Sequence, residues 1–354
     1  MNDKRPLPVI VDTTLRDGIQ MPGTVLSFND KTAILDRLVL LGIKEIEIGC
    51  PAQGSDAVTE IGRLCKRHPS IDCSTWCRAR KTDILAAAAT GVSTIHISFP
   101  VSDRHLAIRG WSREEMLREC TVLIEAARCR VSRVTVGAQD ALRTDPDFLK
   151  LFVANASSAG AARIRIADTV GSATPQAVGR LITDLIASCP AAAFEYHGHN
   201  DFGLATATTL AAMEAGAAAV SVTVQGVGER AGNAPLEEVI TAAVMLYGYS
   251  TGLCLAALSE LCRCTSHGFH LPERPDKAIC GTNAFRHESG IHCYGMLRDE
   301  LAYQPINPAT VGEMSRYSIG RQSGYSSLQA VLREQGLSVN RHQARSLWRK
   351  RHEP

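Results

Sequence analysis

The sequence has no excess of charge of either sign, because 38 Lys and Arg residues nearly cancel 36 Asp and Glu residues and leave a formal net charge of +2. Such a balance gives no electrostatic reason to expect a nucleic acid as a partner. The sequence also lacks any run of about 18 apolar residues, the length that a membrane-spanning helix needs, and it has no apolar secretory segment near its N-terminus. We therefore expect a cytoplasmic protein that binds neither nucleic acid nor membrane.

Two common motifs are also missing. No two of the 12 cysteines are spaced as Cys-x-x-Cys, which argues against a structural zinc site and favours reduced thiols. Gly226, Gly228 and Gly232 do not form the Gly-x-Gly-x-x-Gly motif of dinucleotide-binding proteins, and they follow the last predicted strand instead of the first. Their placement argues against a doubly wound sheet.

What is present is an alternation of short apolar runs with longer helix-like stretches, which is typical of βα units that form a parallel sheet. Predicted helices include Asp30–Leu41, Ser112–Arg128 and Pro175–Ser188, each introduced by Ser or Thr capping residues. The predicted strands are Val9–Asp12, Glu45–Ile48, Asp72–Trp76, Thr94–Ser98, Val131–Val136, Arg163–Ala167, Phe194–His197 and Ala219–Thr223. Eight βα units predict an α/β fold, a (β/α)8 TIM barrel.

The chain changes character after about residue 255, where prolines punctuate shorter segments and the last residues are basic. We expect the catalytic barrel to span 1–255. A smaller, mainly helical C-terminal appendage with a linker would span 256–354. The basic tail is interpreted as the solvated face of a helix.

Polar residues follow the predicted strands, at the end of a barrel where active sites are built. His197 and His199 are two residues apart at the end of the seventh strand, so both imidazoles can point to the same side. Asp17, after the first strand, would complete a set of two histidines and one carboxylate, with Asn233 as a further oxygen ligand. This set predicts one divalent metal ion, and Mg²⁺, Mn²⁺, Zn²⁺ and Fe²⁺ all remain open. A structural histidine pair is the alternative.

Arg16 lies next to the predicted ligand Asp17, and Glu47 lies on the neighbouring strand. The Arg16 guanidinium could stabilise an oxyanion while Glu47 orients it. The alternative is a salt bridge at the strand end that takes no part in chemistry.

These residues lie in motifs that resemble the DRE-TIM metallolyase superfamily. The similarity extends to its acyl-CoA condensing branch, the isopropylmalate, citramalate and homocitrate synthases, and is greatest to the short homocitrate synthases associated with nitrogen fixation. The motifs are Asp-Thr-Thr-Leu-Arg16-Asp17-Gly18, Glu47-Ile-Gly-Cys-Pro51, Ala167-Asp168-Thr169-Val-Gly171, His197-Gly-His199-Asn-Asp-Phe-Gly203, Gly228-Glu-Arg-Ala-Gly-Asn233 and His287-Glu-Ser-Gly-Ile-His292.

The resemblance implies a homocitrate synthase. This activity is a metal-dependent, Claisen-type condensation of acetyl-CoA with 2-oxoglutarate, followed by thioester hydrolysis to homocitrate and CoA. Asp17, His197, His199 and Asn233 would hold the metal. The implied catalytic residues are Arg16, Glu47, His292 and Tyr303, and the implied substrate contacts are Gln20 and Thr169. Family members form homodimers in which the appendage of one subunit delivers the equivalents of His292 and Tyr303 to the other subunit's barrel.

Several positions depart from the family pattern, among them Ile19, Gln139 and Gln322. Thr135 stands where lysine-pathway homocitrate synthases carry an arginine against the distal carboxylate of the acceptor. One of the remaining basic residues would have to bind that second anion. The candidates are Arg78, Arg80, His96, Arg109 and Arg143.

Two other functions stay open. The same chemistry could act on another 2-oxo acid, as in an isopropylmalate, citramalate or phosphonomethylmalate synthase. The chain ends where typical isopropylmalate synthases continue into a regulatory domain, which argues against the first of these. A non-catalytic barrel that binds metal in a regulatory role is the second alternative.

Overall fold

A computed structural model describes residues 5–352 of the chain. The described residues form two compact units. The first contains everything up to Leu253 together with Cys264–His270, and the second contains Cys254–Arg263 and the chain from Leu271 onward.

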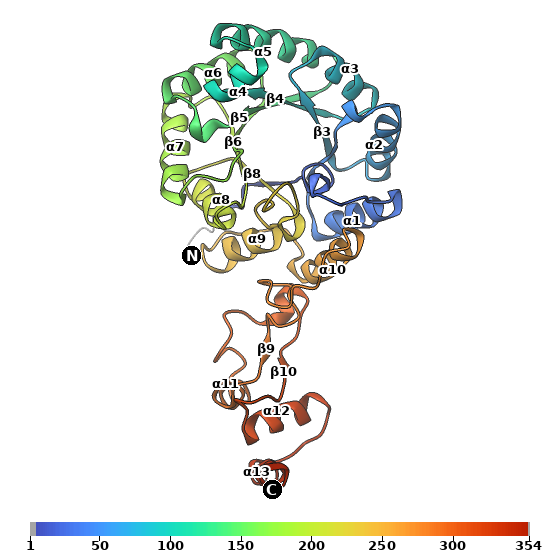
Figure 1. Ribbon diagram of the computed structural model, residues 1–354, viewed down its shortest axis with the longest axis vertical. Helices are drawn as coiled ribbons and strands as arrows, with labels where there is room; N and C mark the ends of the chain where they lie inside the picture. The colour runs from blue at the N-terminus through green and yellow to red at the C-terminus, as the bar shows by residue number, and fades with distance from the viewer. Residues whose placement is uncertain (1–4, 353–354) are drawn as a thin grey trace. The chain divides into compact units, whose positions relative to one another are not determined.

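The first unit is a closed barrel of eight parallel strands in sequence order, in which β1 also pairs with β8. Figure 1 shows the strands in a ring with helices around the outside. The predicted TIM barrel is therefore confirmed. The strands are β1 (Val9–Asp12), β2 (Glu45–Gly49), β3 (Asp72–Arg78), β4 (Thr94–Pro100), β5 (Arg133–Gln139), β6 (Arg163–Asp168), β7 (Phe194–Gly198) and β8 (Ala219–Val222).

Three helices of the barrel, α1, α5 and α7, begin at capping residues that the sequence identifies. Ser27 and Asp30 form a reciprocal capping box at the first helix, and Ser112 with Glu115 forms another. The helices are α1 (Phe28–Leu41), α2 (Ser55–Arg67), α3 (Lys81–Ala89), α4 (Asp103–Arg109), α5 (Arg113–Arg128), α6 (Pro146–Ser158), α7 (Pro175–Ser188), α8 (Ala205–Glu214) and α9 (Leu236–Met245). Short 3-10 helices follow several strands: η1 (Gly18–Gln20), η2 (Pro51–Gln53), η3 (Ala141–Arg143) and η4 (Val224–Gly226).

The largest error in a predicted strand concerns β5, which begins at Arg133 and runs to Gln139 instead of spanning 131–136. Val131 still belongs to the turn after α5, because its amide donates to the Ala127 carbonyl. At the other end, β5 continues because Gly137, Ala138 and Gln139 pair with the end of β4.

The hydrophobic core lies between the strands and the surrounding helices, with residues such as Leu35, Leu38 and Phe152 fully buried. The inside of the barrel is different. It holds a chain of alternating charges in place of the layers of branched apolar residues that usually fill such barrels. Neighbouring pairs from Asp72 to Glu47 lie 2.6–3.0 Å apart, and the chain runs Asp72, Arg133, Glu45, Arg163, Glu195, Arg165, Glu47, Arg16.

This chain of charges follows from the strand periodicity of two residues. On β6 the isoleucines Ile164 and Ile166 alternate with Arg163 and Arg165, so the apolar and the charged side chains take opposite faces. The members that begin strands, such as Arg163, lie toward the N-terminal end of the barrel, and Arg16 lies at the opposite end, beyond β1.

The described part of the second unit contains four α-helices, of which α10 is shared with the first unit, two 3-10 helices and a two-stranded parallel sheet. Its elements are η5 (Leu255–Ala257), α10 (Leu258–Gly268), β9 (Arg286–His287), α11 (Gly290–Met296), η6 (Pro308–Val311), β10 (Arg316–Tyr317), α12 (Tyr325–Glu334) and α13 (Arg341–His352). Among the helices that the structure describes, none has the length and apolar character that crossing a bilayer requires. Within the described residues, no cysteine takes part in a disulfide bond.

Candidate active site

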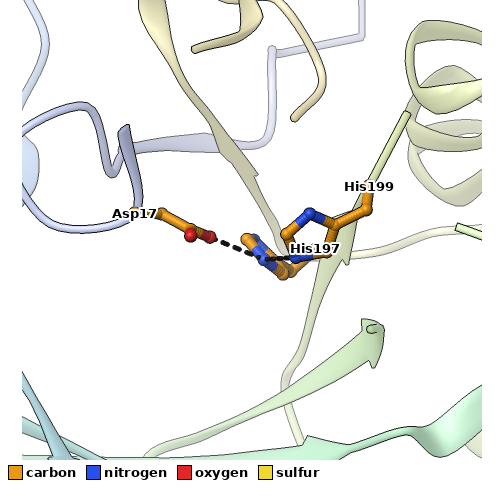
Figure 2. Close-up of side chains that lie close together, drawn as sticks. All are labelled: Asp17, His197 and His199. Carbon is orange, nitrogen blue, oxygen red and sulfur yellow. Dashed lines mark hydrogen bonds and ion pairs between the residues drawn. The ribbon is translucent and has the colours of Figure 1, made fainter. Parts of the chain in front are cut away.

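Two histidines at the end of β7 face the same space. His197 belongs to β7 and His199 follows it, so their side chains project to one side. Their Nε2 atoms lie 3.3 Å apart, and the two rings stand nearly perpendicular at 87°. Asp17 approaches from the loop after β1, with its Oδ2 atom 3.1 Å from His197 Nε2. Figure 2 shows the carboxylate and the two imidazoles converging.

This cluster fits a divalent cation. One ligand atom from each of Asp17, His197 and His199 lies within 4.8 Å of the others. A proton shared by two of these atoms leaves the third without a partner, whereas a cation can bind all three. Asn233 has its Oδ1 buried without a hydrogen-bond partner in the described structure, while its Nδ2 donates to the Val227 carbonyl at 3.0 Å. Carboxylate, imidazole and amide ligands suit Mg²⁺, Mn²⁺, Zn²⁺ or Fe²⁺.

The electrostatics favour the protonation states that a metal requires. Burial raises the pKa of Asp17, but the Arg16 guanidinium and the His197 side chain outweigh burial and hold this pKa well below its ordinary value. Burial and the neighbouring His197 lower the pKa of His199 to about 4. At neutral pH the cluster therefore offers a carboxylate and a neutral imidazole, the forms that bind metals.

A tight turn after β1 presents Arg16 and Asp17 to this space. The Thr13 carbonyl accepts from the amides of Arg16, Asp17 and Gly18 at 2.8–3.2 Å. Gly18 is required at the end of this turn, because a β-carbon there would lie 2.8 Å from a Val227 methyl group. The close approach of the two loops places Asp17 beside the segment that carries Asn233.

Arg16 and Glu47 form a buried ion pair, and the sequence had placed the two residues next to each other. The Arg16 Nε donates to Glu47 Oε1, and Arg16 Nη1 lies 3.3 Å from Asp17 Oδ2. Burial opposes ionisation of Glu47, but Arg16 and Arg165 outweigh it and lower the pKa of Glu47 to about 2. Glu47 is therefore an anion held by two guanidinium groups.

A cavity of about 220 Å³ opens beside the histidines and the Arg16–Asp17 turn. The two implied substrate contacts, Gln20 and Thr169, line this metal-side cavity, and so does His96, one of the candidates for a second anion. The Thr169 hydroxyl accepts from the Asp140 amide at 2.9 Å, so its own proton is available to an acceptor atom. His96 is buried, and its Nε2 has no hydrogen-bond partner within the described residues.

Arg78 does not line the metal-side cavity. It pairs with Asp83 and lines a second cavity of about 420 Å³ together with Arg80 and Arg109. The two cavities adjoin, because both are lined by Trp76, Ser98 and Gln139. Arg143, a further candidate for a second anion, is held by Asp140. Arg80 and Arg109 have no carboxylate partner in the part of the chain that the structure describes.

His292 and Tyr303 lie in the second unit. His292 is on α11 and Tyr303 follows that helix, and their rings stack with centroids 4.3 Å apart at 19°. Both side chains are exposed, Tyr303 at 44%. Of the family departures, Gln139 lines both cavities of the barrel, Ile19 belongs to η1, and Gln322 lies in the second unit.

Sequence reasoning missed Arg165 and Glu195, which lie beneath the site and reach Glu47 and Arg165 respectively. The run Arg163-Ile-Arg165 was a usable signal. Two arginines two residues apart on a barrel strand share the interior face, where a buried cation needs a carboxylate. Trp76 and Gly137, which also line the metal-side cavity, were missed as well.

Comparisons with known proteins agree with this architecture. The profile of the HMGL-like family matches residues 8–264, and that of the family described as homocitrate synthase post-HMGL domain-like matches residues 279–353. The chain is 40% identical to a homocitrate synthase of Frankia alni, over 92% of this chain and 93% of that protein. It is also 40% identical to a 2-isopropylmalate synthase of Sulfurisphaera tokodaii, over 96% of this chain and 88% of that protein.

Among solved structures, the hydroxymethylglutaryl-CoA lyase of Pseudomonas aeruginosa superposes with a TM-score of 0.67 at 22% identity, covering 75% of this chain and 93% of that one. At this identity the likeness concerns the fold alone.

Proposed function

Because the chain belongs to the HMGL-like family, we propose that it condenses acetyl-CoA with a 2-oxo acid, and that 2-oxoglutarate is this acid, which makes the product homocitrate. The observation that carries the proposal is the convergence of Asp17, His197 and His199 beside Arg16, at the end of a barrel where substrates bind. The similarity to a homocitrate synthase and to a 2-isopropylmalate synthase, which extends over most of each protein, supports the proposal.

Asp17, His197 and His199 hold the divalent cation in this proposal, with Asn233 as a further oxygen ligand. When bound, such a cation acts as a Lewis acid on the ketone of the acceptor and gives it a fixed orientation. The chain's own residues then determine how the acceptor sits. Thr169 donates its free hydroxyl proton to the acceptor's C1 carboxylate, and Gln20 and His96 contact the same molecule from other sides of the metal-side cavity.

The bond-forming step needs a base and a cation. His292 of a second subunit takes a proton from the methyl group of acetyl-CoA, and Tyr303, stacked on it, orients the ring. The methyl carbon then bonds to the ketone carbon, and the ketone oxygen becomes an alkoxide whose charge Arg16 stabilises. Water cleaves the thioester and releases CoA and the acid. This arrangement requires a homodimer with shared active sites.

The second carboxylate of 2-oxoglutarate requires a cation that carboxylates have not already neutralised. Arg80 and Arg109 in the adjoining cavity meet this condition and are its proposed partners. One observation favours an alternative acceptor. The arginines that line the metal-side cavity itself, Arg16, Arg165 and Arg230, are all paired with carboxylates. An acceptor whose side chain carries no charge, such as 2-oxoisovalerate, would suit that cavity.

The test is release of free CoA by the purified protein from acetyl-CoA, with a divalent metal and a panel of 2-oxo acids. The panel contains 2-oxoglutarate, 2-oxoisovalerate, pyruvate and a phosphonate-bearing 2-oxo acid. Release with 2-oxoglutarate, with homocitrate identified by mass spectrometry, supports the proposal. Release with 2-oxoisovalerate alone supports the alternative, and no release with any acceptor would favour a non-catalytic barrel.

A further inference from the structure

Arg165 lies at the centre of the buried chain of charges, directly beneath the proposed catalytic arginine. Its Nη2 atom donates to Glu47 Oε2 at 3.0 Å, and its Nε atom donates to Glu195 Oε1 at 2.6 Å. Arg165 is 4% exposed, and both carboxylates are fully buried. A buried guanidinium with two buried carboxylates is a rigid unit, because any rotation breaks a charge-assisted hydrogen bond in a medium of low dielectric constant.

Glu47 is therefore bound by two guanidinium groups. Arg16 bonds to Oε1 and Arg165 bonds mainly to Oε2, so each oxygen has its own guanidinium. The carboxylate cannot turn toward either partner without losing the other. Since the Arg16 Nε donates to this carboxylate, the orientation of the Arg16 side chain depends on Glu47, and therefore on Arg165.

The charge balance leads to the same conclusion. If Arg16 were the sole partner of Glu47, the pair would be neutral and the field of Arg16 on an alkoxide would be weakened. With Arg165 sharing the carboxylate, Arg16 keeps more of its positive field toward the cavity. Glu195, which also accepts from Ser221 Oγ at 2.5 Å, anchors Arg165 from the other side.

Arg165 lines the metal-side cavity, yet all three of its side-chain nitrogens already contact carboxylates. Nε serves Glu195, and Nη1 and Nη2 lie 3.4 and 3.0 Å from the two oxygens of Glu47. This arrangement leaves it poorly suited to bind an acceptor carboxylate. We propose that Arg165 is a positioning residue, which fixes the orientation and preserves the charge of Arg16 through Glu47; this inference rests on the proposed function.

Arg163 provides a matched control within the same strand. It is buried, lies two residues before Arg165 on β6, and bridges two carboxylates, Glu195 and Glu45. It makes no contact with Glu47 or Arg16 among the described contacts. A role in stability alone would affect both arginines alike, whereas the positioning role belongs to Arg165.

The experiment compares Arg165→Lys with Arg163→Lys. Lysine keeps the charge but cannot form the planar, two-sided contact. We expect Arg165→Lys to lower kcat by about 100-fold, since a small misplacement of a catalytic group has effects of this order. The KM for acetyl-CoA and the Mn²⁺ affinity measured by calorimetry should change less than about threefold, because the ligands of the metal are intact. Arg163→Lys should keep kcat within about twofold of the wild type.

An Arg165→Lys enzyme with wild-type kcat, or an equal loss of kcat in Arg163→Lys, would overturn the inference. Should Arg165→Lys fail to fold, the charge-neutral double variant Glu47→Gln/Arg165→Met is compared with Glu47→Gln alone. Equal kcat values mean that Arg165 acts through Glu47, and a further loss of about tenfold or more means that it does not. Turnover by the wild type, measured first, tests the proposed function separately.

Discussion

Gly137 on β5 and His96 on β4 lie so close together that a β-carbon at position 137 would stand 2.7 Å from His96 Nε2. The other ring nitrogen of His96, Nδ1, is 2.9 Å from the Thr135 hydroxyl, which fixes the ring. The missing side chain at position 137 therefore leaves room for an unpaired imidazole nitrogen in the wall of the metal-side cavity.

Replacing Gly137 by alanine should displace this ring. We expect Gly137→Ala to raise the KM for the 2-oxo acid by about tenfold and to cost about 1–3 kcal/mol of stability, because the added methyl overpacks a buried site. Steady-state kinetics and urea unfolding measure both effects. Gly179→Ala is the control, since a β-carbon on this α7 residue would meet its nearest atom at 3.9 Å; an unchanged KM in Gly137→Ala would contradict the role of His96.

The buried carboxylate Glu47 should make stability depend on acid. Its pKa is about 2 in the folded chain against an ordinary value of 4.5, so its stabilising contribution is complete above pH 4.5 and is lost as the pH falls toward 2. Glu47→Gln leaves two guanidinium groups without their shared anion. We expect it to lower the free energy of unfolding by about 3–5 kcal/mol at pH 7.

The difference in the free energy of unfolding between Glu47→Gln and the wild type should shrink as the pH is lowered from 7 to 3.5. Urea unfolding at each pH measures this difference. Glu60→Gln removes a partly exposed pair with Lys31 and should cost less than about 1 kcal/mol. A difference that stays constant or grows in acid would show that folding does not lower the pKa of Glu47.

His292 is the proposed base, so its removal should affect chemistry and not metal binding. We expect His292→Gln to lower kcat by about 10²–10⁴-fold, the usual contribution of general base catalysis. Calorimetry with Mn²⁺ should show the same affinity as in the wild type, because His292 is not among the three clustered ligands. Substantial turnover by this variant would contradict the assignment.

A shared active site predicts complementation between inactive subunits. Mixing Arg16→Ala with His292→Ala chains should produce heterodimers in which one site has both defects and the other has none. Heterodimers isolated with two different affinity tags should then show about half of the wild-type turnover. Inactive heterodimers, or a monomeric wild-type protein in sedimentation, would exclude the shared site.

The parts of the structure that the sequence predicts well are those that depend on local pattern. Ser27 and Ser112 cap their helices as expected, and the alternation of apolar runs predicts the barrel. Residues that follow different strands meet at the mouth of the barrel, because parallel strands all end at the same edge. For that reason residues as distant as Asp17 and His197 could be placed together before the structure was known.

Contacts inside the barrel could not be predicted in the same way. Arg165 and Glu47 are 118 residues apart, and their pairing depends on the stagger of the strands, which no local pattern reveals. The pairing of Arg78 with Asp83 was missed for another reason. The sequence shows that a cation lies at the end of β3, but not that a helix residue five positions later neutralises it.

The central claim is that Asp17, His197 and His199 hold one divalent cation on which the acceptor is oriented. Calorimetric titration of the metal-free protein with Mn²⁺ tests it most directly, with Asp17→Asn and His199→Ala beside the wild type and His105→Ala as a control from the second cavity. We predict one ion per chain in the wild type and in His105→Ala, and an affinity lower by about 100-fold or more in the two ligand variants. Equal Mn²⁺ binding by all four proteins would contradict the account.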